Sequence, residues 1–118
     1  MTRARGHALQ HATAGVFAAA GWVHAESTPN GRPGRDILGI PGIYVEIKTS
    51  FAGTSPGAVV QDTACKAGGD LPLIWYWPPG VGARRPDLAV VMMPPAAALR
   101  LLREAGYGPE LITRKDLP

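Results

Sequence analysis

The chain of 118 residues contains a single cysteine, Cys65, and no long apolar segment. One cysteine excludes a disulfide within the chain, so a reducing compartment is permitted. No apolar run approaches the length that crosses a bilayer, and the segment after the basic N-terminus is interrupted by Gln10, His11 and Thr13. From these absences we expect a cytoplasmic protein with no membrane-spanning helix.

Acidic residues are also scarce, because nine Asp and Glu stand against twelve Lys and Arg, a net charge of +3. A small positive charge favours a polyanionic partner, although it says nothing about the fold. The length of 118 residues leaves room for one domain with a modest core and no separate regulatory module. We therefore expect a single domain over residues 1–118 with one active site.

Hydrophobic spacing and turn-forming residues divide the chain into regular elements. Apolar residues at helical spacing end at Gly21, and Ser55-Pro56 is typical of a helix start. In chain order we expect a helix at 9–20, a strand at 22–26, two short strands on either side of Pro41-Gly42, a helix at 55–67, a strand at 71–77, a strand at 88–93 and a helix at 94–105. This order predicts an α/β fold in which helices flank one mixed sheet.

Residues 36–48 contain the pattern that suggests a function: Asp36 before a short strand, then Glu46-Ile47-Lys48 in the next strand. Residues two apart in a strand share a face, so Glu46 and Lys48 project together while Ile47 points the other way. The intervening Pro41-Gly42 reads as a turn. Pairing of the two strands around this turn would bring Asp36 beside Glu46.

Two adjacent carboxylates repel each other unless a cation lies between them. A hard divalent ion that takes oxygen ligands and keeps some waters suits such a pair, so we expect Mg²⁺, with Mn²⁺ able to substitute. Lys48 would then position a water or stabilise charge that develops on a phosphodiester. Taken singly, Glu46 and Lys48 could be an ordinary exposed pair and Asp36 a turn cap. Their conjunction favours the functional interpretation.

The segments Gly34–Gly39 and Glu46–Thr49, with the order of elements around them, resemble the PD-(D/E)XK nuclease superfamily and especially the Holliday junction resolvase-like proteins of actinobacterial phages. The resemblance covers roughly residues 7–106 and leaves a short C-terminal tail. It implies a restriction-endonuclease-like fold, with Asp36, Glu46 and Lys48 as the catalytic core and the two carboxylates as metal ligands. It also implies a homodimer that cuts four-way DNA junctions during DNA recombination or repair in a bacterial or phage-infected host cell.

The helix at 55–67 supplies further candidates. Gln61 occupies a position where related resolvases tend to carry a glutamine, which implies a catalytic role, although a helix glutamine is more often solvated. Lys66 is a candidate DNA contact, and it cannot share the direction of Gln61 because five residues advance a helix by about 500°. Asp62 lies one turn before Lys66, so that the two are expected to form an ordinary helix ion pair.

The first helix lacks any aspartate or glutamate, whereas the family usually places an acidic metal-site residue there. Gln10, His7 or His11 could stand in for it, or Glu26 on the next strand could supply the charge. The sequence leaves these alternatives open. A weaker metal affinity would follow from the missing acid.

Basic residues in the loop before Asp36 are candidate DNA contacts. Arg32 and Arg35 could clamp phosphates, and Ser27 corresponds weakly to a phosphate-binding serine of resolvases. Solvation of a charged loop would explain the same two arginines. Arg84-Arg85 allow both interpretations as well, and solvation is favoured for them.

Trp75 and Trp77 share one face of their strand, which favours a core strand buried on both sides over a dimer interface or a base-stacking surface.

Three rival functions stay open beside the junction resolvase. The first is a nuclease of the same fold that acts on flaps, ends or nicked duplex. The second is a catalytically inactive DNA-binding module, which the missing acid favours. The third is a structural interaction module.

Overall fold

The fold is built from helices and short strands in the order that the sequence predicts. The computed structural model describes residues 3–29 and 34–108. In these ranges the helices are α1 (Arg3–Ala19), α2 (Pro56–Ala67) and α3 (Pro95–Glu104). The strands are β1 (Glu26–Ser27), β2 (Ile37–Leu38), β3 (Ile43–Lys48), β4 (Leu71–Tyr76) and β5 (Val90–Met92), and a short 3₁₀ helix, η1, spans Pro86–Leu88.

Three helix ends coincide with the residues that predicted them, whereas α1 begins at Arg3, before the expected start at residue 9. The side-chain oxygen of Ser55 accepts a hydrogen bond of 3.2 Å from the backbone N–H of Ala58, which satisfies a free donor in the first turn of α2. Gly21 follows α1 with φ of 118°, and Gly106 follows α3 with φ of 98°. Positive φ at these positions ends each helix at little steric cost because glycine has no Cβ.

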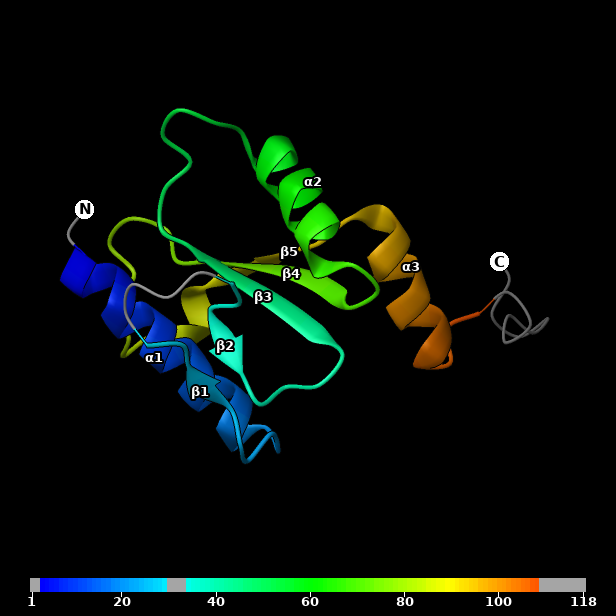
Figure 1. The fold of residues 1–118 in the computed structure, drawn as a ribbon, viewed down its shortest axis with the longest axis horizontal. Coiled ribbons are helices and arrows are strands. Elements are labelled where there is room, and N and C mark those ends of the chain that lie inside the picture. The colour runs from blue at the N-terminus through cyan, green and yellow to red at the C-terminus, as the bar shows by residue number, and fades with distance from the viewer. Residues whose placement is uncertain (1–2, 30–33, 109–118) are drawn as a thin grey trace, which may run out of the picture.

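The strands form two small sheets. β1 and β2 pair antiparallel, and a second sheet has the order β3-β4-β5, with β3 parallel and β5 antiparallel to β4. Parallel neighbours need a crossover, which α2 provides between β3 and β4. With α1 on one face of the larger sheet and α2 on the other, the described residues form a single α/β domain (Figure 1).

The face of the sheet that packs against α1 holds most of the apolar core. Val45 and Trp77 are fully buried there, and the Trp77 indole N–H donates to Thr13 Oγ1 of α1 at 3.0 Å. Phe17 of α1 packs against Trp75, with ring centroids 5.2 Å apart. Trp75 and Trp77 therefore serve the core, as the alternation of this segment predicts.

Three predictions about the strands are wrong in detail. Residues 22–25 form a turn closed by a hydrogen bond from Ala25 N to Trp22 O, so the strand expected at 22–26 is reduced to Glu26 and Ser27. The strand expected at 88–93 forms only at Val90–Met92, after η1. The two strands around Pro41-Gly42 do not pair with each other: β2 pairs with β1, and β3 with β4. The expected single mixed sheet is consequently two separate sheets.

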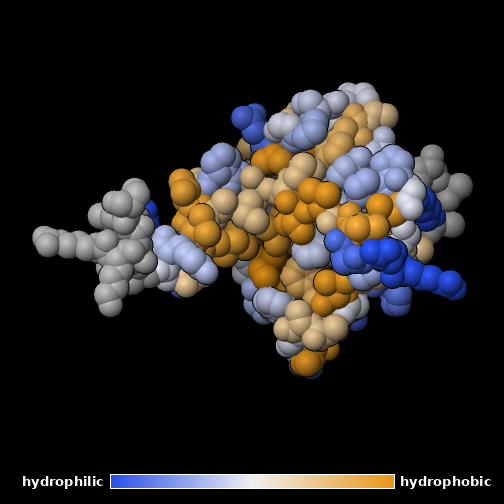
Figure 2. Space-filling model, turned by 180° about the vertical axis from the view of Figure 1, so that it is seen from behind, coloured by the Kyte–Doolittle hydropathy of each residue, from blue (hydrophilic) through white to orange (hydrophobic). Residues whose placement is uncertain are grey.

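Apolar side chains also reach the surface. Figure 2 shows hydrophobic residues gathered across the face opposite to the view of Figure 1. The exposed large hydrophobic residues in the last part of the fold are Leu88, Val90, Val91, Leu99, Leu102 and Tyr107. No helix in the described residues has both the length and the hydropathy to cross a membrane.

Candidate functional site

Asp36 lies against the free edge of β3. Its Oδ2 accepts a hydrogen bond of 2.7 Å from the backbone N–H of Ile47, the residue between Glu46 and Lys48. Neighbouring Arg35 donates from Nη1 to the carbonyl oxygen of Ile43 at 3.0 Å. Two side chains thus satisfy backbone groups of β3 that a neighbouring strand would otherwise take. Asp36 approaches the Glu-x-Lys strand as the sequence predicts, but through this side-chain contact instead of a hairpin ladder.

Gln10 of α1 fixes the backbone at Asp36. Its Nε2 donates to the carbonyl oxygen of Asp36 at 2.8 Å and to that of Thr28 at 3.1 Å. The Thr28 backbone N–H also donates to the carbonyl oxygen of Asp36, at 2.9 Å. Of the four residues that could stand in for the missing helix acid, Gln10 contacts Asp36, whereas His7, His11 and Glu26 are exposed. The contact positions Asp36 without adding a carboxylate.

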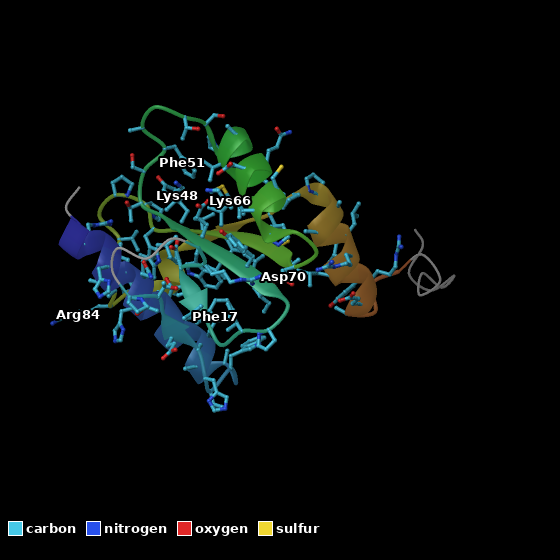
Figure 3. The ribbon with its side chains drawn as sticks, viewed as in Figure 1. Phe17, Lys48, Phe51, Lys66, Asp70 and Arg84 are labelled. Atoms are coloured by element: carbon cyan, nitrogen blue, oxygen red, sulfur yellow. The ribbon has the colours of Figure 1, made fainter. Side chains whose placement is uncertain are left out.

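Glu46 points from β3 toward α2, and both of its carboxylate oxygens meet residues of that helix. The buried hydroxyl of Thr63 donates to Oε2 at 2.5 Å, and the ammonium of Lys66 lies 3.7 Å from Oε1. Lys66 also forms the expected pair with Asp62, at 3.0 Å. Figure 3 shows Lys48 and Lys66 on the side of β3 that carries α2. The structure therefore brings two carboxylates and two ammonium groups to one region.

The charges in this region act on one another. Burial raises the pKa of Asp36, the negative charge of Glu46 raises it further, and the Ile47 N–H with the charges of Lys48 and Lys66 partly opposes both effects. The pKa of Lys66 is raised, first by its hydrogen bond to Asp62 and then by the charge of Glu46. A cation between the two carboxylates would relieve the cost of keeping Asp36 ionised.

The carboxylate pair fits a magnesium ion by its chemistry. Mg²⁺ keeps several waters and is typically bound through one or two carboxylates together with substrate phosphates. Asp36 Oδ1 makes no hydrogen bond to any described residue, while Oδ2 is taken by Ile47. In the described part of the chain no group of three or more His, Cys, Asp or Glu could hold a metal ion. Asp36 and Glu46 would thus hold an ion with an incomplete set of protein ligands, which leaves positions for water and phosphate.

Gln61 does not join this group. It is exposed on α2, whereas Val59, Thr63 and Ala67 form the buried stripe of the helix. Two residues advance an α-helix by about 200°, so Gln61 lies nearly opposite Thr63. Among the described residues Gln61 makes no contact with Glu46, so its catalytic role remains a prediction.

The predicted DNA contacts around Asp36 have different environments. Arg35 forms an ion pair with Asp70 and lies over the ring of Tyr44, with its guanidinium carbon 5.1 Å from the ring centroid. Ser27 is half-buried in β1 and pairs with Ile37, the residue after Asp36. Arg32 lies outside the described residues. The contacts of Arg35 give it a structural role, and its contact with DNA remains a prediction.

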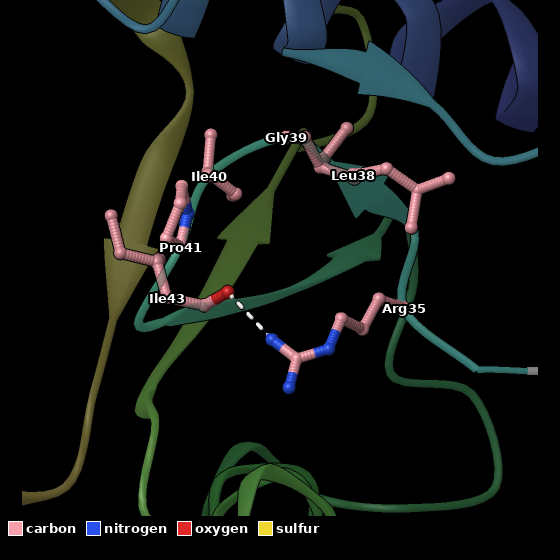
Figure 4. Close-up of a pocket in the computed structure, with 7 residues that line it drawn as sticks. Arg35, Leu38, Gly39, Ile40, Pro41 and Ile43 are labelled. Carbon is pink, nitrogen blue, oxygen red and sulfur yellow. Dashed lines mark hydrogen bonds between the residues drawn. The ribbon is translucent and has the colours of Figure 1, made fainter. Parts of the chain in front are cut away.

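A hollow of about 200 Å³ lies beside Arg35, but the carboxylates do not line it. Figure 4 shows the Arg35 side chain crossing this hollow to the Ile43 carbonyl oxygen, with Leu38, Ile40 and Pro41 around it. Its lining is mostly apolar, and it faces the turn between β2 and β3. This hollow is therefore separate from the candidate metal site.

Thr63 is the site residue that the sequence interpretation missed. It is fully buried, and its hydroxyl is bonded to the candidate metal ligand Glu46. Val59, Thr63 and Ala67 recur at intervals of four residues, so a threonine stands in an otherwise apolar stripe of α2. A polar residue in such a stripe requires a buried partner, and this signal could have identified Thr63.

Comparisons with known proteins identify no relative of this chain, because no family model, no curated protein and no solved structure matches it.

Proposed function

We propose that the chain is a metal-dependent DNA endonuclease of the PD-(D/E)XK type, with a restriction-endonuclease-like fold. One observation carries the proposal: Asp36, from outside the larger sheet, bonds the backbone between Glu46 and Lys48. This contact places a second carboxylate at the Glu-x-Lys strand. An exposed ion pair on a strand would not require such an arrangement.

The residues of the site then have separate tasks. Asp36 and Glu46 would hold Mg²⁺ or Mn²⁺, which supplies Lewis-acid polarisation of the phosphodiester and a more acidic water. The Ile47 N–H orients the Asp36 carboxylate, and Thr63 orients that of Glu46. Lys48 presents a positive charge on the same face and stabilises negative charge that develops on the phosphate. Gln61 belongs to the proposal as a helper that would need to act through solvent or DNA.

Four-way junctions are the proposed substrate, and a homodimer is the proposed assembly. A two-fold junction suits two active sites related by symmetry. The exposed apolar residues of β5 and α3 offer surface that a second copy could cover, and these include Val90, Val91 and Leu99. A dimeric mass in sedimentation at micromolar concentration is expected, and a monomer both free and on junction DNA would contradict the dimer. Action in the cytoplasm of a bacterial or phage-infected host cell belongs to the same proposal.

An inactive DNA-binding module is the second candidate, because α1 contributes an amide at Asp36 where an acidic residue would strengthen metal binding. A same-fold nuclease acting on flaps, ends or nicked duplex is the third. The retention of Asp36, Glu46 and Lys48 in one region argues for catalysis. The same contacts do not favour a four-way junction over flaps, ends or nicked duplex as the substrate.

The test is cleavage of labelled four-way junction, flap, linear duplex and single-stranded DNA with Mg²⁺, Mn²⁺ or chelator. Wild type should make paired symmetric nicks in the junction, and Glu46→Gln and Lys48→Gln should abolish them. Arg84→Gln, at an exposed position away from the site (Figure 3), serves as the matched control and should cut normally. Equal cutting of all substrates would make the protein a general nuclease. Binding without metal-dependent cutting would establish the inactive module.

A further inference from the structure

Lys66 stands between an exposed partner and a largely buried one. Its Nζ lies 3.0 Å from Asp62 Oδ2 and 3.7 Å from Glu46 Oε1. The exposed fraction of the side chain is 51% for Lys66, 60% for Asp62 and 18% for Glu46. The ammonium therefore bridges the outer surface of α2 and the candidate metal ligand.

Glu46 needs a cationic neighbour when no metal is bound, because a largely buried carboxylate near a second carboxylate is costly. Thr63 occupies Oε2, and Lys66 faces Oε1. A divalent ion on Glu46 would compete with Lys66 for Oε1, and the two cations would repel each other. Asp62 retains the displaced ammonium at the edge of the site, where the phosphate of a bound DNA strand would approach.

Resting on the proposed function, we infer that Lys66 is a built-in counter-ion of Glu46 that couples metal binding to DNA binding. Before the metal binds, Lys66 neutralises Glu46. After it binds, Lys66 is released from Glu46, stays beside Asp62 and contacts a DNA phosphate. Coupling between two ligands is reciprocal, so DNA that engages Lys66 must also tighten the metal.

The first experiment measures Mn²⁺ binding by isothermal titration calorimetry. Lys66→Gln should bind Mn²⁺ about two- to fivefold more tightly than wild type, the range that corresponds to losing an exposed ion pair. Lys66→Arg, which keeps the charge, should restore wild-type affinity. Arg84→Gln removes one positive charge at an exposed position far from α2 and should leave the affinity unchanged (Figure 3). Equal Mn²⁺ affinities of wild type and Lys66→Gln would overturn the inference.

The second experiment measures binding of a labelled four-way junction by fluorescence anisotropy, in EDTA and in Ca²⁺, with the DNA checked for integrity afterwards. Lys66→Gln should lose more affinity in Ca²⁺ than in EDTA, because in EDTA the wild-type ammonium is already engaged by Glu46. A loss of equal size in both conditions would mean that Lys66 is an ordinary DNA contact and would overturn the coupling.

Failure of the proposed function would look different from failure of the inference. If wild type binds no Mn²⁺, or if Glu46→Gln binds it as well as wild type, the metal site itself is wrong. If Glu46→Gln abolishes Mn²⁺ binding while Lys66→Gln binds Mn²⁺ no more tightly than wild type, the metal site is supported and the counter-ion role of Lys66 is wrong.

Discussion

Two fully buried threonines, Thr13 on α1 and Thr63 on α2, lie on opposite faces of the same sheet and have different partners. The Thr13 hydroxyl accepts from the Trp77 indole and donates to the Leu9 carbonyl oxygen, so both of its partners belong to the core. The Thr63 hydroxyl donates to the carboxylate of Glu46. The α1 face is thus organised around apolar packing, and the α2 face around the hydrogen-bonded carboxylate of Glu46.

The difference indicates that the α1 face mainly contributes stability, whereas the α2 face carries the charged residues of the candidate site. The α1 face satisfies a buried polar group in order to complete the core. The α2 face holds Glu46, beside which Asp36 and Lys66 have shifted pKa values. Groups with perturbed pKa values cluster at functional sites more often than in structural cores. Substitutions on the two faces should therefore separate folding from function.

The largest effect is expected from Trp77→Ala on the α1 face. Trp77 is fully buried, and its truncation leaves a cavity and removes the indole N–H that donates to the Thr13 hydroxyl. The free energy of unfolding should fall by about 3–5 kcal/mol in urea titration. Trp75→Phe is the matched control, since the Trp75 indole N–H is buried without a partner among the described residues. If Trp75→Phe costs as much as Trp77→Ala, the described core is wrong.

The paired threonine substitutions compare the two faces directly. Thr13→Val leaves the Trp77 indole N–H unpaired and should cost about 1–3 kcal/mol, with Mn²⁺ binding unchanged. Thr63→Val removes a hydrogen bond to Glu46 and should cost about 1–2 kcal/mol and also weaken Mn²⁺ binding. Urea unfolding and calorimetric titration measure both quantities. If Thr13→Val weakens Mn²⁺ binding as much as Thr63→Val does, the two faces do not differ in function.

Asp36→Asn should leave stability unchanged or raise it, because Asn can still accept the Ile47 hydrogen bond while the buried charge is removed. The pKa of Asp36 is raised above 3.8 in the folded state, chiefly by burial. Ionised Asp36 therefore lowers stability at neutral pH, and this cost vanishes as the pH falls through the raised pKa toward 3.8. Unfolding in chelator at several pH values should show the Asn variant gaining on wild type as the pH rises. A variant that is least stable relative to wild type at neutral pH would contradict this sign.

The smallest effect is expected from an exposed ion pair at η1. Arg85 and Asp87 form an exposed ion pair at 2.9 Å, and the hydrogen bond from Arg85 lowers the pKa of Asp87. The pair adds stability above pH 3.8 that is lost as the pH falls through the lowered pKa. Because both side chains are solvated, Asp87→Asn should not measurably change the unfolding midpoint at neutral pH. A clear loss of stability would mean that the segment at Arg85 and Asp87 contributes more to stability than its exposure indicates.

Local signals in the sequence predicted where α1 ends and where α2 begins. Ser55-Pro56 and Gly21 determine where a helix begins or ends through backbone geometry that depends on few neighbours. The face shared by Glu46 and Lys48 also follows from strand geometry alone. These features required no knowledge of distant contacts.

Pairing between strands could not be predicted in the same way. β3 takes a parallel partner beyond α2 because the crossover returns the chain beside it, whereas the Pro41-Gly42 turn suggested a hairpin with its neighbour β2. The contacts of Gln10, Arg35 and Thr63 join residues separated along the chain. No short pattern specifies such partners, so the candidate ligands were predictable and the groups that hold them were not.

The most direct test of the two-face account is the thermal unfolding midpoint with and without Mn²⁺ for wild type, Asp36→Asn and Glu46→Gln. A ligand that binds only the folded state stabilises it, by about 2.7 kcal/mol at a concentration one hundredfold above its Kd. Wild type should shift upward with Mn²⁺, and both variants should fold but fail to shift. If wild type does not shift, or if the variants shift equally, Asp36 and Glu46 do not form a metal site.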